Sequence, residues 1–160
     1  MPSKKIYKVS IVMGSQSDFK TMKLCQKVFK ILNVKFETKI ISAHRTPYRM
    51  YEFAKKAKKN DIAVIIAGAG GSAHLPGMIS SLTSIPVLGV PIESKKLKGL
   101  DSLLSMNMPN GVPLAVMSIN GAFNAGLYAA SIIGTYDSKV KSNLDRWKRQ
   151  QTQSVKKKPK

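Results

Sequence analysis

The 160-residue sequence contains a single cysteine, Cys25, and only two histidines, His44 and His74. One cysteine excludes an internal disulfide bond, and its place in a predicted helix indicates a small buried residue. No carboxylate cluster accompanies the histidines, so we predict no metal site. No apolar run reaches membrane-spanning length, and no signal-type apolar segment follows the basic N-terminus, so we expect a cytoplasmic protein without a membrane partner.

Acidic residues are also scarce: eight stand against 27 lysines and arginines, which gives a formal net charge of +19. Such an excess is typical of proteins that bind nucleic acids. Only four of these cations are arginines, however, and the lysines are spread along predicted helix faces without interleaved aromatic residues. We therefore interpret the charge as a solvated surface that attracts small anionic ligands, and we do not expect a nucleic-acid partner.

Apolar, β-branched stretches alternate with amphipathic segments along the whole chain. Strands are predicted at 6–13, 34–41, 62–67, 86–91 and 112–119. Helices are predicted at about 19–32, 47–59, 97–106, 122–134 and 137–150, and a further helix follows the turn at 68–77 and ends at about residue 82. This alternation predicts one α/β domain, a three-layer doubly wound parallel sheet with right-handed crossovers. The domain is expected over 1–150, with its core over about 6–134, followed by a basic, disordered tail over 151–160.

Three polar turns follow predicted strands, at 14–18, 42–47 and 68–77. Because ligands bind outside the carboxyl ends of the strands in such sheets, we expect these turns to converge on one site. The middle turn opens a helix, with Thr46 as the predicted N-cap and Pro47 in the first turn. A helix N-terminus favours anions, and His44 is suited to proton exchange near neutral pH.

The common nucleotide and hydrolase motifs are missing or misplaced. The stretch 68–73 fits G-x-G-x-x-A, but it follows the third strand and no suitable ribose-binding acid follows it, so we do not expect a dinucleotide. No phosphate-cradling G-x-x-x-x-G-K-[ST] loop and no G-x-S-x-G elbow occur. What remains is a site without metal or cofactor, with imidazoles, a guanidinium, a carboxylate and hydroxyls, which suits proton transfer on a phosphorylated substrate.

Several of these motifs together resemble the class I N5-carboxyaminoimidazole ribonucleotide mutase family of purine (IMP) biosynthesis. The matching stretches are Met13–Asp18, Ser42–Pro47, Ala67–Met78, Gly89–Pro91, Asp101–Leu103 and Met108–Pro109, within a likeness that covers about residues 8–150. The resemblance implies a homo-octamer and an isomerase that needs no ATP, metal or organic cofactor. Its ribonucleotide substrate exchanges an N-carboxylate for a ring-carbon carboxylate, giving 4-carboxy-5-aminoimidazole ribonucleotide.

The resemblance also implies roles for individual residues. His44 would be the general acid and base. The remaining residues would bind substrate: Ser15, Asp18 and Arg45 at the ribose and phosphate, Ser42, Ala43, Gly70, Gly71 and Ser72 along the pocket, and His74 and Leu75 over the imidazole and carboxylate.

Three other interpretations stay open from the sequence. A related carboxylase would use free carbon dioxide with aminoimidazole ribonucleotide, although the turns at 44–47 and 73–76 argue against it. A non-catalytic phospho-ligand module could use the same flavodoxin-like fold, because such folds host many functions. A nucleic-acid binder would show steeply salt-dependent binding to unrelated DNA without turnover.

Overall fold

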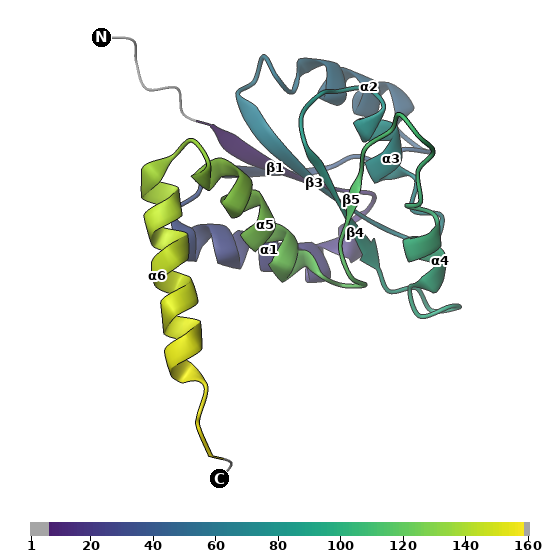
Figure 1. Cartoon of the computed structure of the whole chain (residues 1–160). Helices are drawn as coiled ribbons and strands as arrows, with labels where there is room; N and C mark the ends of the chain where they lie inside the picture. Colours follow the sequence, from purple (N-terminus) through teal and green to yellow (C-terminus); the bar gives the residue numbers. More distant parts are fainter. Residues whose placement is uncertain (1–6, 159–160) are drawn as a thin grey trace.

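Five parallel strands form one sheet in a computed structural model that describes residues 7–158 (Figure 1). The strands are β1 Lys8–Met13, β2 Phe36–Ile40, β3 Ile62–Gly70, β4 Val87–Ile92 and β5 Ala115–Val116. Their order across the sheet is β2-β1-β3-β4-β5, and every recorded pairing is parallel. This is the strand order of flavodoxin-like doubly wound folds, so the predicted fold class is confirmed.

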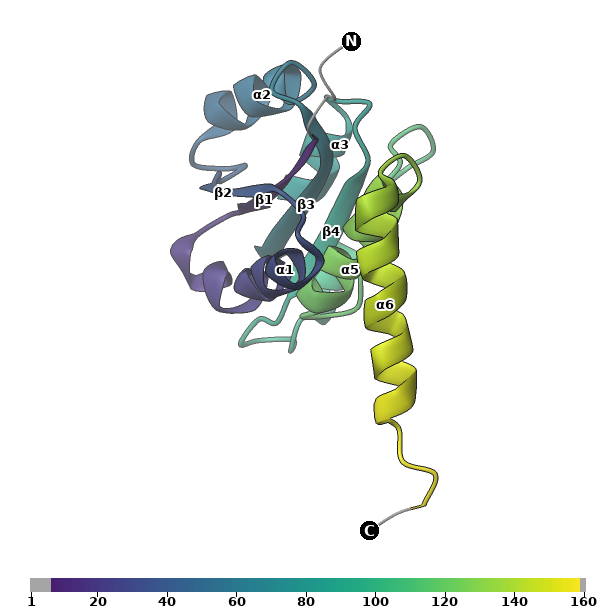
Figure 2. The same ribbon diagram turned by 90° about the vertical axis from the view of Figure 1, so that its left-hand side faces the viewer.

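Helices cover both faces of the sheet (Figure 2). One face carries α1 Phe19–Leu32, α5 Ala122–Gly134 and α6 Ser138–Ser154, and the other carries α2 Pro47–Lys56 and α3 Leu75–Ser80. A short 3-10 turn, η1 Gln16–Asp18, precedes α1, and the five-residue helix α4 Leu100–Leu104 follows β4. Across residues 7–158, no helix has both the length and the apolar character needed to cross a membrane.

The sheet separates two apolar cores. Along β3, Val64 and Ile66 pack with α1 and α5, whereas Ile65 and Ala67 pack with α2 and α3. All four side chains are fully buried, because successive residues of a strand point to opposite faces and both faces here carry helices. The uninterrupted apolar sequence of this strand therefore follows from its central position.

The strand β3 continues through Gly70, three residues beyond its predicted end. Gly68 pairs with Val90 and Gly70 pairs with Ile92 on β4. A Cβ atom at Gly68 would lie 2.3 Å from the sulfur of Met22, so this glycine lets α1 pack closely on the sheet. The first part of the predicted 68–77 turn is therefore strand, and Gly68 serves packing instead of ligand approach.

Other boundaries also differ from the sequence prediction. The fifth strand has two residues instead of the predicted 112–119. It begins late because Pro113 has no N–H for a sheet ladder and Gly111 adopts a left-handed φ of 96° just before it. The helix α2 ends at Lys56, before a tight turn in which Asp61 has a φ of 57°.

The predicted disorder of residues 151–160 is wrong for the first four of them. The helix α6 continues through Ser154, because neither glycine nor proline interrupts the sequence 138–154. Residues 159–160, and residue 6 of the predicted first strand, lie outside the described residues. The helix runs past the body of the molecule at its C-terminal end (Figure 1).

Small residues on α5 bring it close to α1. A Cβ atom at Gly126 would lie 3.0 Å from the Cβ of Val28, so the two helix backbones approach closely at this point. The small-residue face of α5 is therefore used within the chain.

Candidate functional site

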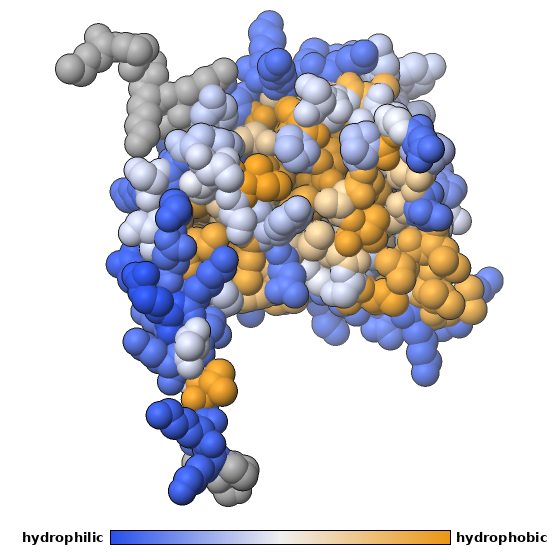
Figure 3. Space-filling view, in the orientation of Figure 1, coloured by the Kyte–Doolittle hydropathy of each residue, from blue (hydrophilic) through white to orange (hydrophobic). Residues whose placement is uncertain are grey.

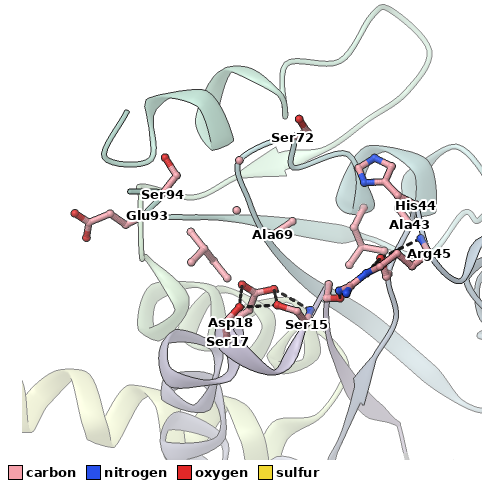
Figure 4. Close-up of a pocket in the computed structure, with 16 residues that line it drawn as sticks. Ser15, Ser17, Asp18, Ala43, His44, Arg45, Ala69, Ser72, Glu93 and Ser94 are labelled. Carbon is pink, nitrogen blue, oxygen red and sulfur yellow. Dashed lines mark hydrogen bonds between the residues drawn. The ribbon is translucent and has the colours of Figure 1, made fainter. Parts of the chain in front are cut away.

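A cavity of about 520 Å³ lies at the carboxyl ends of the strands (Figure 4). The three polar turns that the sequence singled out all contribute to it, so the predicted convergence is confirmed. Every predicted site residue lines this cavity except His74: Ser15, Asp18, Ser42, Ala43, His44, Arg45, Gly70, Gly71, Ser72 and Leu75.

The turn after β1 is organised by the carboxylate of Asp18, whose residue is only 8% exposed. Its Oδ2 accepts hydrogen bonds from the backbone N–H of Ser15 at 3.0 Å and from the Ser15 hydroxyl at 3.2 Å. Its Oδ1 accepts one from the Ser17 hydroxyl at 3.4 Å. A carboxylate offers about four lone-pair sites, so Asp18 retains capacity for one ligand hydroxyl.

The turn after β2 is closed by Thr46, but not as a side-chain cap. Its hydroxyl accepts from the Ser42 N–H at 3.0 Å and donates to the Ser42 carbonyl at 2.9 Å. Thr46 is the N-cap residue of α2, as predicted, but its side chain makes no hydrogen bond to the helix. The hydroxyl serves the turn instead, because both backbone groups of Ser42 lie within its reach.

Arg45 links two of the turns. Its guanidinium donates at 3.4 Å to the carbonyl of Gly14, which lies in the turn after β1. Its Nε donates to the Ser42 hydroxyl, also at 3.4 Å. These long bonds leave most of the five guanidinium N–H groups for an anion, and Arg45 is the only cation among the residues that line the cavity.

His44 is paired with His74 from the turn after β3. The Nε2 of His44 lies 2.9 Å from the Nδ1 of His74, and the two rings meet edge to face at 89°. His74 itself faces a separate groove of about 390 Å³, which Met78 and Met108 also line. The structure thus places His74 behind His44 and not in the lining of the main cavity.

The turn after β3 depends on Gly71, whose φ is +70°, a conformation that residues with a side chain rarely adopt. Two tight turns follow, in which Ala73 N–H donates to the Gly71 carbonyl and His74 N–H to the Ser72 carbonyl, both at 2.9 Å. Figure 4 shows Ser72 at the rim of the cavity, with His44 on the adjacent wall.

A fourth turn, after β4, completes the cavity and was missed in the sequence. It contributes Glu93 and Ser94, opposite His44 and Arg45 in Figure 4. The Glu93 carboxylate accepts from the Asn120 amide at 3.1 Å, and Asn120 Oδ1 accepts from the Glu93 N–H at 3.0 Å. The signal was available, because polar residues also follow the fourth predicted strand at the same edge. Ser17 is a further lining residue that the sequence reasoning did not assign.

Within residues 7–158, no three His, Cys, Asp or Glu side chains lie close enough together to surround a metal ion. The cavity instead combines one imidazole, one guanidinium, two carboxylates and several hydroxyls. Such a set binds an anionic, hydroxyl-bearing molecule and offers a group that exchanges protons near neutral pH.

The fold and this cavity define a class: doubly wound α/β proteins with a polar ligand cavity at the carboxyl edge of the sheet. Within that class, the AIR carboxylase family model matches residues 8–154. The chain therefore belongs to the AIR carboxylase family.

Individual relatives agree with this assignment. N5-carboxyaminoimidazole ribonucleotide mutase of Vibrio vulnificus is 50% identical over 151 residues, which cover 92% of this chain and 94% of the relative. The protein of the same name from Pyrococcus horikoshii is 52% identical over 153 residues, covering 95% of this chain and 86% of the relative. A crystal structure of Treponema denticola PurE superimposes with a TM-score of 0.82 at 26% identity, covering 91% of each chain.

Proposed function

We propose that this protein is an N5-carboxyaminoimidazole ribonucleotide mutase, an isomerase of purine biosynthesis. The observation that carries the proposal is the placement of His44 in the wall of a cavity that also presents Arg45 and Asp18. Relatives that bear the name of this enzyme are about 50% identical over more than nine-tenths of the chain, which supports the same reaction here.

In the proposed complex, the phosphate of the ribonucleotide binds at Arg45. A guanidinium forms charge-assisted, often bidentate hydrogen bonds with phosphate, and the bonds of Arg45 within the chain are long. The ribose binds at Asp18 and Ser15, where the carboxylate can accept one more hydroxyl. The imidazole base then lies among Ser42, Ala43, Leu75 and the turn 70–72.

His44 transfers the protons of the proposed reaction. It gives a proton to the exocyclic nitrogen as the bond from that nitrogen to the carboxylate carbon breaks and carbon dioxide forms. The ring carbon bonds to this carbon dioxide, and His44 accepts the proton that leaves the ring carbon. One imidazole serves both steps, because the second step returns the proton that the first step consumed.

His74 acts on this reaction through His44. Their hydrogen bond engages the Nε2 of His44, so Nδ1 is the ring nitrogen that this contact leaves for the substrate. The contact also fixes the orientation of the His44 ring, because a hydrogen bond at one ring nitrogen of an imidazole determines which nitrogen carries the proton and where the other one points.

The proposed reaction needs neither ATP nor a metal ion, because the substrate already carries the carboxylate carbon and the protons balance within the cycle. The enzyme acts in the cytoplasm, since a charged ribonucleotide is confined to the compartment in which it is made.

We also propose the homo-octamer that the family resemblance implies. Apolar side chains support assembly: Leu97, Leu100 and Leu104 are 57%, 49% and 64% exposed, and Figure 3 shows a hydrophobic patch over α4.

Turnover of the purified protein tests this function. The substrate is N5-carboxyaminoimidazole ribonucleotide, supplied without ATP and with a chelator, and the ring-carboxylated product is measured. We expect faster product formation than from aminoimidazole ribonucleotide with bicarbonate. The reverse order of rates would identify the carboxylase instead. If neither reaction gave product, the protein would be a ligand-binding module without this activity.

A single substitution tests the role of His44. His44→Asn keeps a polar side chain of similar size but cannot exchange protons, so we expect kcat to fall roughly 10²- to 10⁴-fold. Circular dichroism and the melting temperature should match the wild type, because His44 is exposed. Activity near the wild-type level would refute the role.

A further inference from the structure

The short helix α4 has its polar and apolar sides reversed relative to an ordinary surface helix. Its leucines Leu100 and Leu104 are exposed, whereas Ser102 is fully buried at 0% exposure. A buried hydroxyl is costly unless it is hydrogen-bonded, so the partners of Ser102 indicate what the inward side of α4 holds.

The Ser102 hydroxyl joins the ends of the two central strands. It accepts from the Gly71 N–H at 2.8 Å and donates to the Ile92 carbonyl at 2.6 Å. Gly70 and Ile92 form the last pair in the register of β3 and β4. The hydroxyl therefore bridges the strands one residue further, at the point where the chain turns into the cavity wall.

Two neighbours of Ser102 strengthen this attachment. The Ser105 hydroxyl lies 2.6 Å from the Asp101 carbonyl and 3.2 Å from the Gly71 carbonyl. The Asp101 carboxylate accepts from the Ser94 hydroxyl at 2.7 Å and from the Ser102 N–H at 3.0 Å. The inward side of α4 thus contacts both Gly71 and Ser94, which line the cavity from the turns after β3 and β4.

Gly71 in turn determines where His74 lies. Its left-handed φ starts the two consecutive tight turns that end at the His74 N–H, and His74 is bonded to His44. The Gly71 N–H donates to Ser102, so this amide holds the turn in place and does not serve as a ligand donor.

We propose that Ser102 is a positioning residue for the reaction: by holding Gly71, it fixes the turn that carries His74 against His44. This inference rests on the proposed role of His44. A misplacement of about 1 Å in a catalytic group can cost on the order of 10²-fold in rate. Ser102 therefore affects kcat without contacting the substrate.

The test compares Ser102→Ala with Ser80→Ala. Ser80 is also buried, its hydroxyl also donates to a backbone carbonyl, that of Pro113, and it does not line the cavity. Ser102→Ala leaves two backbone groups without their partner and Ser80→Ala leaves one, so we expect the melting temperature to fall in both variants and further in Ser102→Ala. Only Ser102→Ala should lower kcat, by about 10- to 100-fold with a much smaller change in KM.

Hydrogen–deuterium exchange of the peptide that spans 70–75 provides a readout independent of turnover. Loss of the bond from Gly71 should speed exchange there by up to about tenfold in Ser102→Ala and leave it unchanged in Ser80→Ala. If Ser102→Ala does not fold, Ser105→Ala is compared in the same way, because it loosens Gly71 but retains the strand bridge.

Three results would overturn the proposal: unchanged exchange at 70–75, wild-type kcat despite faster exchange, or an equal loss of kcat in Ser80→Ala. A wild-type protein without turnover would refute the proposed function separately, and the exchange measurement would still decide whether Ser102 holds Gly71.

Discussion

Arg45 carries the recognition of the phosphate in the proposed complex, because it is the only cation that lines the cavity. Charge-assisted hydrogen bonds contribute about 1.5–3 kcal/mol, so Arg45→Ala should raise KM by roughly 10- to 100-fold with a smaller effect on kcat. Steady-state kinetics measure both constants.

The matched variant Arg45→Lys keeps the charge but loses the planar fork of donors, so its KM should lie between those of the wild type and Arg45→Ala. An unchanged KM in Arg45→Ala would show that the phosphate binds elsewhere.

Cys25 is a second residue whose behaviour follows from its surroundings. It is fully buried on α1, and its thiol donates to the Ala122 carbonyl at 3.0 Å. Burial raises the pKa of the Cys25 thiol to about 12, although its backbone hydrogen bond opposes this shift. Because the thiolate is the reactive form, native protein at pH 8 should resist maleimide labelling, and unfolded protein should label rapidly. Rapid labelling without unfolding would contradict the burial of Cys25.

Much of the site could be predicted at the scale of residues, because His44, Arg45 and Asp18 directly follow recognisable strands. The contact between His44 and His74 could not, because it depends on the path of two loops 30 residues apart in sequence. Ser102 was equally hidden. It lies in the stretch Asp101–Leu103 that resembles the mutase family, but nothing in the local sequence indicates that its hydroxyl bridges two strand ends.

At the scale of elements, the edge strand β2 is fastened to β1 by a charge cluster around Glu37. Its carboxylate accepts from Lys8 at 2.7 Å, from Lys39 at 2.9 Å and from Ser10 at 3.1 Å. Partial burial raises the pKa of Glu37, but the hydrogen bonds and charges of the lysines outweigh it, so the pKa lies below its ordinary value.

A lowered folded-state pKa means that the cluster stabilises the protein above the unfolded pKa of about 4.3 and loses this effect as the pH falls through the folded pKa. Glu37→Gln should therefore lower the free energy of unfolding at pH 7 by about 1 kcal/mol or less, and with it the melting temperature. The melting temperature of the variant should also fall less steeply than that of the wild type as the pH is lowered.

Thermal melts from pH 7 to pH 3 measure this difference. Glu52→Gln is the control, because it removes an exposed pair with Lys56 on a single helix. An equally steep acid decline in Glu37→Gln and wild type would contradict the role of the cluster.

The elements that could be predicted were those with strong local signals. Asn33 ends α1 with a φ of 56°, directly after the predicted helix 19–32. The Asp137 carboxylate caps α6 by accepting from two backbone N–H groups, at the predicted start of the helix 137–150. The glycines of β3 misled the prediction, because glycine signals a turn in sequence but here also permits close packing against Met22. Only the tertiary contact distinguishes these two uses.

At the scale of the whole molecule, the proposed octamer buries the exposed leucines of α4. Eight copies of the 17.5 kDa chain give a mass of about 140 kDa, which light scattering coupled to size-exclusion chromatography measures directly. Leu104→Gln should shift this mass toward smaller species, because it places an amide in the apolar contact.

The matched control is Ile31→Gln, since Ile31 on α1 is similarly exposed, at 57%, and lies outside the α4 patch. It should leave the mass unchanged. A wild-type mass near 17.5 kDa would contradict assembly, and an equal effect of both substitutions would exclude a specific role for α4.

The central claim is that the carboxylate carbon moves within one substrate molecule, with His44 transferring the protons. The most direct measurement follows the carbon itself: N5-carboxyaminoimidazole ribonucleotide with a ¹³C carbamate carboxylate is converted in unlabelled bicarbonate buffer. We expect the product to retain most of the ¹³C, because carbon dioxide formed in the cavity reacts before it escapes. A product that carries only the unlabelled carbon of the buffer would contradict the mutase and identify an enzyme that uses free carbon dioxide.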